Sequence, residues 1–152
     1  MTRLAVIIAT IAGLGYVPFA PGTFGSAAGL ALYWPVFGSA GAQLLAICTL
    51  LALGIWSATT AERFFATDDP GPVVIDEVMG MLITLFQVRV GWAGALVGFL
   101  LFRIADIVKP FPSGRLERLP GGLGVMADDA MAAVYANLAL RGVLWAAPQW
   151  FT

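Results

Sequence analysis

The chain has 152 residues, of which 60% are hydrophobic and only 11% are charged, and its mean hydropathy is +0.89. Because a soluble domain carries about a quarter charged residues, this composition indicates one membrane-embedded domain over residues 1–152. The net charge of −1 gives nucleic-acid binding no electrostatic support. The absence of histidine removes the commonest general base, and the single cysteine, Cys48, excludes an intramolecular disulfide.

The N-terminal apolar run, Leu4 to Gly15, is too short to cross a bilayer by itself. A transmembrane helix needs about 20 apolar residues, so we expect a short re-entrant or interfacial helix here. A cleaved signal peptide is disfavoured, because the candidate site at Pro18-Phe19-Ala20 lacks the small-x-small pattern and the apolar character continues beyond it.

Five further apolar stretches predict helices in the rest of the chain. They cover residues 27–37, 42–57, 73–90, 92–108 and 130–147. The second is expected to continue to Arg63, and the last two end before Pro110 and Pro148, which cannot continue a helix. Trp145 and Trp150 are placed to anchor the last span at an interface. The predicted fold class is all-α, a polytopic integral membrane helical bundle with short or re-entrant N-terminal helices.

Alternating helix directions place the loops around residues 18–25, 61–75 and 109–129 on one side of the membrane, here called side A. All nine carboxylates of the chain fall at or near side A. Side A collects Arg63, Arg103, Lys109, Arg115 and Arg118, whereas Arg89 and Arg141 fall on the other side. Since cytoplasmic loops carry an excess of Lys and Arg, side A is predicted to be cytoplasmic.

Three charged clusters are expected at the side-A ends of different helices. They are Asp76-Glu77, the set Arg103, Asp106 and Lys109, and Asp128-Asp129. Ionisable residues at membrane depth are costly, and they are usually functional. Simpler structural roles stay open, namely helix capping for Asp128 or Asp129, an ion pair between Arg103 and Asp106, and snorkelling of Lys109 to the interface.

Carboxylates that converge from three helices, without histidine or thiolate, form a site of hard oxygen ligands. Such a site suits Mg²⁺, which takes one or two carboxylates together with water and substrate phosphate. The chemistry that fits is metal-assisted phosphoryl transfer at the membrane surface. A histidine-nucleophile phosphatase is excluded by the lack of histidine, and a cysteine phosphatase by Gly54, which stands where an arginine must follow Cys48.

The segment APGTFGSAAGL supplies a candidate phosphate contact. Pro21-Gly22 predicts a turn, and Thr23 and Ser26 predict hydroxyl caps before a helix of small residues. Free N–H groups at a helix N-terminus, next to two hydroxyls, can hold a phosphate. Two other polar segments, Asp68-Asp69 and Glu117-Arg118, predict a solvated turn and a solvated loop.

Four short blocks in this order resemble the bacterial phosphatidylglycerophosphatase A family, and the resemblance spans nearly the whole chain. They are PGTFGS at 21–26, IDEVMGM at 75–81, FRIADIVKPFP at 102–112 and GGLGVMADD at 121–129. The resemblance implies a Mg²⁺-dependent hydrolase of the bacterial inner membrane that removes the terminal phosphate of phosphatidylglycerophosphate. The cytoplasmic origin of that substrate agrees with the assignment of side A. Ile75 and Phe111 stand where the family often has tryptophan, and both keep the position apolar.

On this basis we expect five carboxylates to supply the Mg²⁺ ligands and a general base: Asp76, Glu77, Asp106, Asp128 and Asp129. Arg103 and Lys109 are expected to bind the substrate phosphate and to stabilise its developing charge. Thr23 and Ser26 are expected to contact the phosphate through their hydroxyls and nearby N–H groups. The alternative function is a small membrane transporter or ion channel that uses buried carboxylates.

Overall fold

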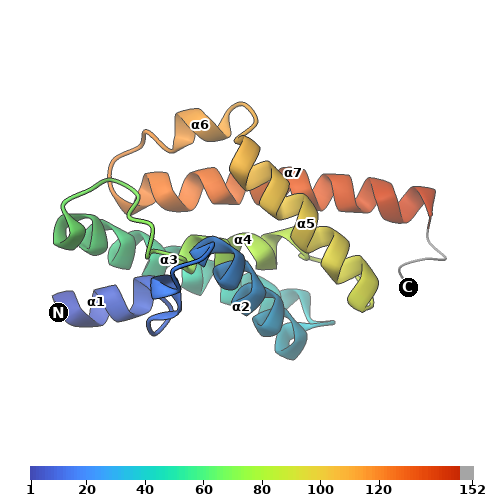
Figure 1. Cartoon of the computed structure of the whole chain (residues 1–152). Coiled ribbons are helices and arrows are strands. Elements are labelled where there is room, and N and C mark those ends of the chain that lie inside the picture. The colour runs from blue at the N-terminus through green and yellow to red at the C-terminus, as the bar shows by residue number, and fades with distance from the viewer. Residues whose placement is uncertain (148–152) are drawn as a thin grey trace.

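The structure, a computed structural model, describes residues 1–147, which form helices with no strand among them (Figure 1). The elements in chain order are α1 (Thr2–Ala9), the 3-10 helix η1 (Leu14–Tyr16), α2 (Pro21–Val36), α3 (Ala40–Phe65), α4 (Ile75–Thr84), α5 (Trp92–Val108), α6 (Ser113–Leu116) and α7 (Gly122–Ala146). The predicted all-α class is confirmed. The predicted short N-terminal helix is confirmed as well, because α1 has only 8 residues.

Helix α4 lies at the centre of the molecule, where it packs against α2, α3, α5 and α7 (Figure 1). All of its residues are buried except Glu77 and Ile83, which are partly exposed. At Gly80 a Cβ atom would lie 2.4 Å from the ring of Phe102 on α5, so glycine is needed for this close packing. The two acids at the start of α4 therefore open a helix that belongs to the core.

The helix predicted over residues 73–90 is shorter in the structure, because α4 ends at Thr84 and a turn follows. A side chain from another helix satisfies the carbonyls that α4 leaves free. The Asn137 amide on α7 donates to the carbonyls of Ile83, Thr84 and Phe86 at 2.8–3.2 Å. Since buried carbonyls need partners, these contacts stabilise a helix end that the local sequence does not mark.

Replacing Asn137 with leucine is expected to lower the free energy of unfolding by about 2 kcal/mol, because the Thr84 carbonyl loses its donor and the Ile83 and Phe86 carbonyls each lose one of their donors. Chemical unfolding of the purified chain in detergent measures this change. The control is Leu138→Ala at an exposed neighbour on α7, for which we expect a change of under about 0.5 kcal/mol. Equal stability of Asn137→Leu and the wild type would contradict this account of the α4 terminus.

Two predicted helix starts also differ from the structure. Helix α2 begins at Pro21 rather than at residue 27, since proline fits the first turn of a helix. Helix α7 begins at Gly122 rather than at residue 130, so Asp128 and Asp129 lie about two turns inside it. Helix capping is therefore the wrong interpretation of these two acids.

Two helices of the described chain, α3 and α7, are long and apolar enough to cross a membrane. The other predicted spans are shorter, since α2 has 16 residues, α4 has 10 and α5 has 17. Membrane crossing by all five of the predicted spans stays a prediction. Trp145, one of the two predicted anchors, is 88% exposed near the end of α7, and Trp150 lies outside the described residues.

Candidate active site

Charged side chains from the core helices meet at one cavity of about 260 Å³, here called the acidic cavity. Its lining comes from the start of α2, the loop before α4, the start of α4, the end of α5, and α7. The charged members are Asp69, Asp76, Glu77, Arg103, Asp106, Lys109, Asp128 and Asp129. The structure therefore brings together all five predicted carboxylates and both predicted basic residues.

Asp76, Glu77 and Asp129 form a compact group in the acidic cavity. Each offers one carboxylate oxygen, and the three oxygens lie within 4.8 Å of one another. Asp76 is only 7% exposed and Asp129 only 3%. Each of the three residues also has one buried oxygen that accepts no hydrogen bond from residues 1–147. Buried anionic oxygens are costly without a partner, so this arrangement favours a bound cation.

The geometry and chemistry of the group suit a small divalent cation. Mg²⁺ binds oxygens at about 2.1 Å, so two of its ligands are at most about 4.2 Å apart. The three oxygens found here all lie within 4.8 Å of one another, which is close to that separation. Carboxylates and water are the ligands that Mg²⁺ prefers, and the residues that line the cavity include no thiolate or imidazole. The donor set therefore fits the predicted ion.

Arg103 of α5 lies between two acids of the acidic cavity. Its Nη1 atom is 2.7 Å from Asp106 Oδ2, one turn later on the same helix, and 3.7 Å from Glu77 Oε1 on α4. All three side chains are less than one fifth exposed. The predicted Arg103–Asp106 ion pair is thus present, and it fixes the guanidinium beside the group formed by Asp76, Glu77 and Asp129.

Lys109, which follows α5 directly, joins two further acids. Its Nζ atom donates to Asp128 Oδ2 at 2.8 Å and lies 2.7 Å from Glu117 Oε1. Burial lowers the pKa of Lys109, but hydrogen bonds and negative charges from Asp128 and Glu117 outweigh burial and raise the pKa above its ordinary value. The amine therefore stays charged, and it is held in ion pairs rather than free to extend to an interface.

Two acids of the site, one that lines the cavity and one that pairs with Lys109, were not predicted from the sequence. Asp69 is exposed, as predicted for a solvated turn, but it also lines the acidic cavity. Glu117, predicted in a solvated loop, is 40% exposed and pairs with Lys109. The Pro70-Gly71 turn was a usable signal for Asp69, because it returns the chain toward Asp76. Glu117 offered no such signal, since its contact depends on how the long connection before α7 folds.

The PGTFGS block reaches the acidic cavity through the backbone of α2. Gly22 lines the cavity, whereas Thr23 and Ser26 do not, and the buried Ser26 hydroxyl donates to the Gly22 carbonyl at 2.9 Å. A Cβ atom at Gly22 would lie 2.1 Å from Glu77 Oε1 and 2.8 Å from Arg103 Nη1. Glycine therefore allows α2 to approach these two charged groups. Phosphate binding by the two hydroxyls stays a prediction.

Comparison with known proteins identifies one family. A family model described as Phosphatidylglycerophosphatase A matches residues 7–144. Phosphatidylglycerophosphatase A of Haemophilus influenzae is 36% identical over 137 residues, which cover 86% of this chain and 83% of the relative. The Escherichia coli protein of the same name is 34% identical over 126 residues, which cover 80% and 73%.

A third relative carries a different name. It is a Bacteroides thetaiotaomicron protein named as a candidate phosphatidylinositol-3-phosphatase, 38% identical over 152 residues that cover 93% of this chain and 94% of the relative. No solved structure matches this chain significantly. The sequence relatives therefore agree on a lipid phosphatase, and their names differ in the lipid.

Proposed function

Because the chain belongs to the phosphatidylglycerophosphatase A family, we propose that it is a Mg²⁺-dependent phosphatase that hydrolyses phosphatidylglycerophosphate to phosphatidylglycerol and inorganic phosphate. The observation that carries this proposal is the group of three carboxylates, the buried Asp76 and Asp129 and the partly exposed Glu77, beside the Arg103 guanidinium. It combines a place for a metal ion with a fixed positive charge for the phosphate. Residues 1–152 form one phosphatase domain in this proposal.

Metal and phosphate are bound by different side chains of the acidic cavity. Asp76, Glu77 and Asp129 would hold Mg²⁺, which supplies positive charge where the phosphate oxygens gain negative charge during phosphoryl transfer. Arg103 offers a planar, permanently charged donor that can bind two phosphate oxygens at once, and Asp106 orients it. The arginine would therefore stabilise the transferring group from α5, next to the carboxylates of α4 and α7.

In this proposal Asp106 or Asp128 accepts the proton of the attacking water. Asp106 and Asp128 line the acidic cavity outside the group of three, and each is held by a basic side chain, Arg103 or Lys109. A positioned carboxylate within reach of the attacking water can accept its proton. Lys109 stays charged and adds a second positive charge to the phosphate side of the cavity.

A membrane location is supported by the apolar surface of the molecule. A row of exposed side chains follows α5 at helical spacing, namely Leu96, Leu100, Ile104 and Ile107. A continuous exposed apolar face of this kind needs a covering, and α3 and α7 are long enough to span a bilayer. The lipid substrate can keep its acyl chains in the bilayer while only its phosphorylated headgroup enters the cavity.

In this proposal the chain is a multi-pass protein of the bacterial inner membrane, and the acidic cavity faces the cytoplasm. The orientation is supported by the basic residues at the cavity end of the helices, of which Arg103 and Lys109 line the cavity itself. A transporter or ion channel is not favoured, because the relatives are named as phosphatases and the charges gather near one end of α2, α4 and α5.

Phosphate release from two lipids tests the proposed activity. The purified chain in detergent micelles is assayed with phosphatidylglycerophosphate and with phosphatidylinositol 3-phosphate, each with Mg²⁺ and with EDTA. We expect Mg²⁺-dependent release, with a kcat/KM for phosphatidylglycerophosphate at least about tenfold higher. Preference for the inositol lipid would contradict the substrate, and release in EDTA would contradict the metal. No release from either lipid would contradict the phosphatase function.

Replacing Gly22 with alanine is expected to lower kcat/KM by about 10- to 100-fold, because the added methyl displaces Glu77 and Arg103 from the cavity. Steady-state phosphate release measures the effect. Gly142→Ala is the matched control, since a Cβ at Gly142 meets no atom within 4 Å, and we expect it to keep wild-type activity. Full activity of Gly22→Ala would show that the close approach of α2 is not needed.

A further inference from the structure

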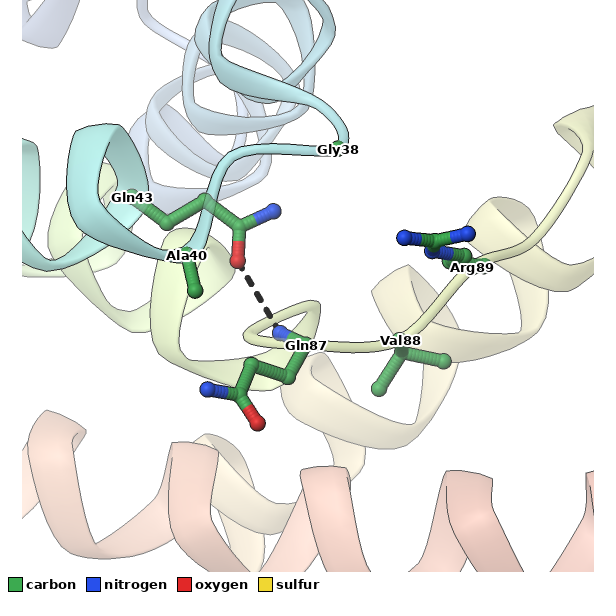
Figure 2. A pocket seen from close by; sticks show the side chains of 6 residues that line it. All are labelled: Gly38, Ala40, Gln43, Gln87, Val88 and Arg89. Atoms are coloured by element: carbon green, nitrogen blue, oxygen red, sulfur yellow. Dashed lines mark hydrogen bonds between the residues drawn. The ribbon is translucent and has the colours of Figure 1, made fainter.

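A second cavity, of about 250 Å³, lies between the α2–α3 turn and the turn that follows α4 (Figure 2). Its lining residues are Gly38, Ala40, Gln43, Gln87, Val88 and Arg89, and it is here called the Arg89 pocket. The acidic cavity lies at the start of α2, whereas the Arg89 pocket lies just beyond its end. The 16 residues of α2, a length of about 24 Å, therefore separate the two sites.

The Arg89 pocket carries a positive charge that no acid balances. Arg89 is exposed, and it forms no ion pair with any residue of the described chain. None of the residues that line the pocket is an acid. An unbalanced guanidinium at the mouth of a cavity attracts anions, and among anions it favours phosphate and carboxylate, which match its fork of donors.

Gln43 supplies a second donor inside the pocket. The side chain is 3% exposed, and its Oε1 atom accepts a hydrogen bond from the Gln87 backbone N–H at 3.0 Å (Figure 2). Its Nε2 atom donates to no acceptor among residues 1–147, and Figure 2 shows it directed into the space between Gly38 and Arg89. An amide nitrogen that faces a cavity from an otherwise buried side chain, with no acceptor among the described residues, is available to a ligand that accepts hydrogen bonds.

An apolar groove of about 390 Å³ begins at the same α2–α3 turn. Its lining includes Leu32 and Val36 of α2 and Ala42, Leu45 and Leu50 of α3. Val36 and Ala42 flank the pocket residues Gly38 and Ala40 in the chain, so the polar and the apolar site both lie beside the α2–α3 turn, although they share no lining residue. This combination matches an amphiphile with an anionic headgroup and a hydrocarbon chain.

We propose that the Arg89 pocket binds the phosphate of an anionic phospholipid, with one acyl chain of that lipid in the adjoining groove. The inference rests on the membrane location proposed above, but not on the chemistry of the acidic cavity. The lipid contacts Arg89, the Gln43 amide and the first turn of α3 at Ala40, beside the Ser39 cap that already accepts the Ala42 N–H. It thereby links the α2–α3 turn to the turn after α4 and stabilises the folded chain.

Thermal unfolding of the full chain in detergent tests this proposal. The midpoint is measured with dihexanoyl phosphatidylglycerol, dihexanoyl phosphatidylcholine or inorganic phosphate. We expect a saturable rise with phosphatidylglycerol and little change with the other two. Arg89→Gln is expected to weaken the binding roughly tenfold, because it removes a charge-assisted contact. Gln43→Leu is expected to weaken it as well, whereas Arg3→Gln, a control at an exposed arginine outside the pocket, keeps wild-type binding.

Several outcomes would overturn the lipid site. Wild-type binding by Arg89→Gln would show that the pocket is not used, and an equal effect of phosphatidylcholine would remove the requirement for negative charge. If inorganic phosphate raised the unfolding midpoint as much as phosphatidylglycerol, the acyl chain would not contribute to binding. Loss of binding in Asp129→Asn would place the lipid in the acidic cavity instead. Arg89→Gln is expected to hydrolyse phosphatidylglycerophosphate at the wild-type rate, so failure of the lipid site and failure of the phosphatase assignment appear in separate assays.

Discussion

Asp129→Asn is expected to lower kcat for phosphate release from phosphatidylglycerophosphate by at least about 100-fold while the protein stays folded. The loss follows because Asp129 supplies one of the three oxygens of the proposed metal group and is almost fully buried. Stability is expected to change in the other direction. Removing one of three neighbouring buried negative charges relieves desolvation and repulsion, so the unfolding midpoint in EDTA should equal or exceed that of the wild type.

The combination of lost activity and retained stability separates a metal ligand from a structural acid. Asp68→Asn is the matched control, since Asp68 is exposed and does not line the acidic cavity, and it should keep wild-type activity. Steady-state kinetics and thermal unfolding in EDTA are measured on the same preparations. Wild-type turnover of Asp129→Asn would contradict the role of this residue, and a large loss of stability in EDTA would make it a structural residue.

Arg103→Gln is expected to lower kcat/KM by about 1,000-fold, because an arginine that stabilises phosphoryl transfer is worth about 10³–10⁵ in rate. In the described chain, Arg103 is the only basic side chain that forms an ion pair with the group of Asp76, Glu77 and Asp129. Its Nη1 atom lies 3.7 Å from Glu77 Oε1. Arg103→Lys keeps the charge but loses the planar fork, so we expect an intermediate loss of about 100-fold. If the arginine binds two phosphate oxygens at once, kcat/KM should fall from the wild type to Arg103→Lys and again to Arg103→Gln. This order tests two-point phosphate binding more sharply than either variant alone.

The matched control for Arg103 is Arg63→Gln, at an exposed arginine in the last turn of α3 and outside the acidic cavity. It should leave the kinetics of phosphate release unchanged. Equal activity of Arg103→Lys and the wild type would show that only the positive charge of this side chain is needed and not its planar guanidinium. Equal activity of Arg103→Gln and the wild type would remove it from the phosphate site.

The sequence was informative about the site wherever charge stood out from an apolar background. Asp76 and Glu77 could be placed in the first turn of a helix, and the acid clusters could be assigned to one side, because charges at membrane depth are few. Assigning Asp76, Glu77 and Asp129 to one group required the packing of α4 against α7, which no local pattern encodes.

Helix boundaries were less predictable because side chains distant in the sequence set them. The end of α4 at Thr84 depends on Asn137, 53 residues away, whose amide satisfies the free carbonyls. The start of α7 at Gly122 could not be read from apolar periodicity, because its first two turns carry glycine and acidic residues rather than a continuous apolar face. The ion-pair partners of Lys109 could not be predicted from the sequence either, since Asp128 lies on a different helix and Glu117 lies in a loop.

The most direct test of the central claim, that Asp76, Glu77 and Asp129 hold a divalent cation, is a measurement of Mn²⁺ affinity by electron paramagnetic resonance. Mn²⁺ shares the oxygen-ligand preference of Mg²⁺ and reports its own free concentration. We predict that the purified wild type binds Mn²⁺ in competition with Mg²⁺. Asp76→Asn and Asp129→Asn should each weaken that binding by at least about tenfold, and Asp68→Asn should not. Wild-type Mn²⁺ affinity in both Asp76→Asn and Asp129→Asn would contradict the account.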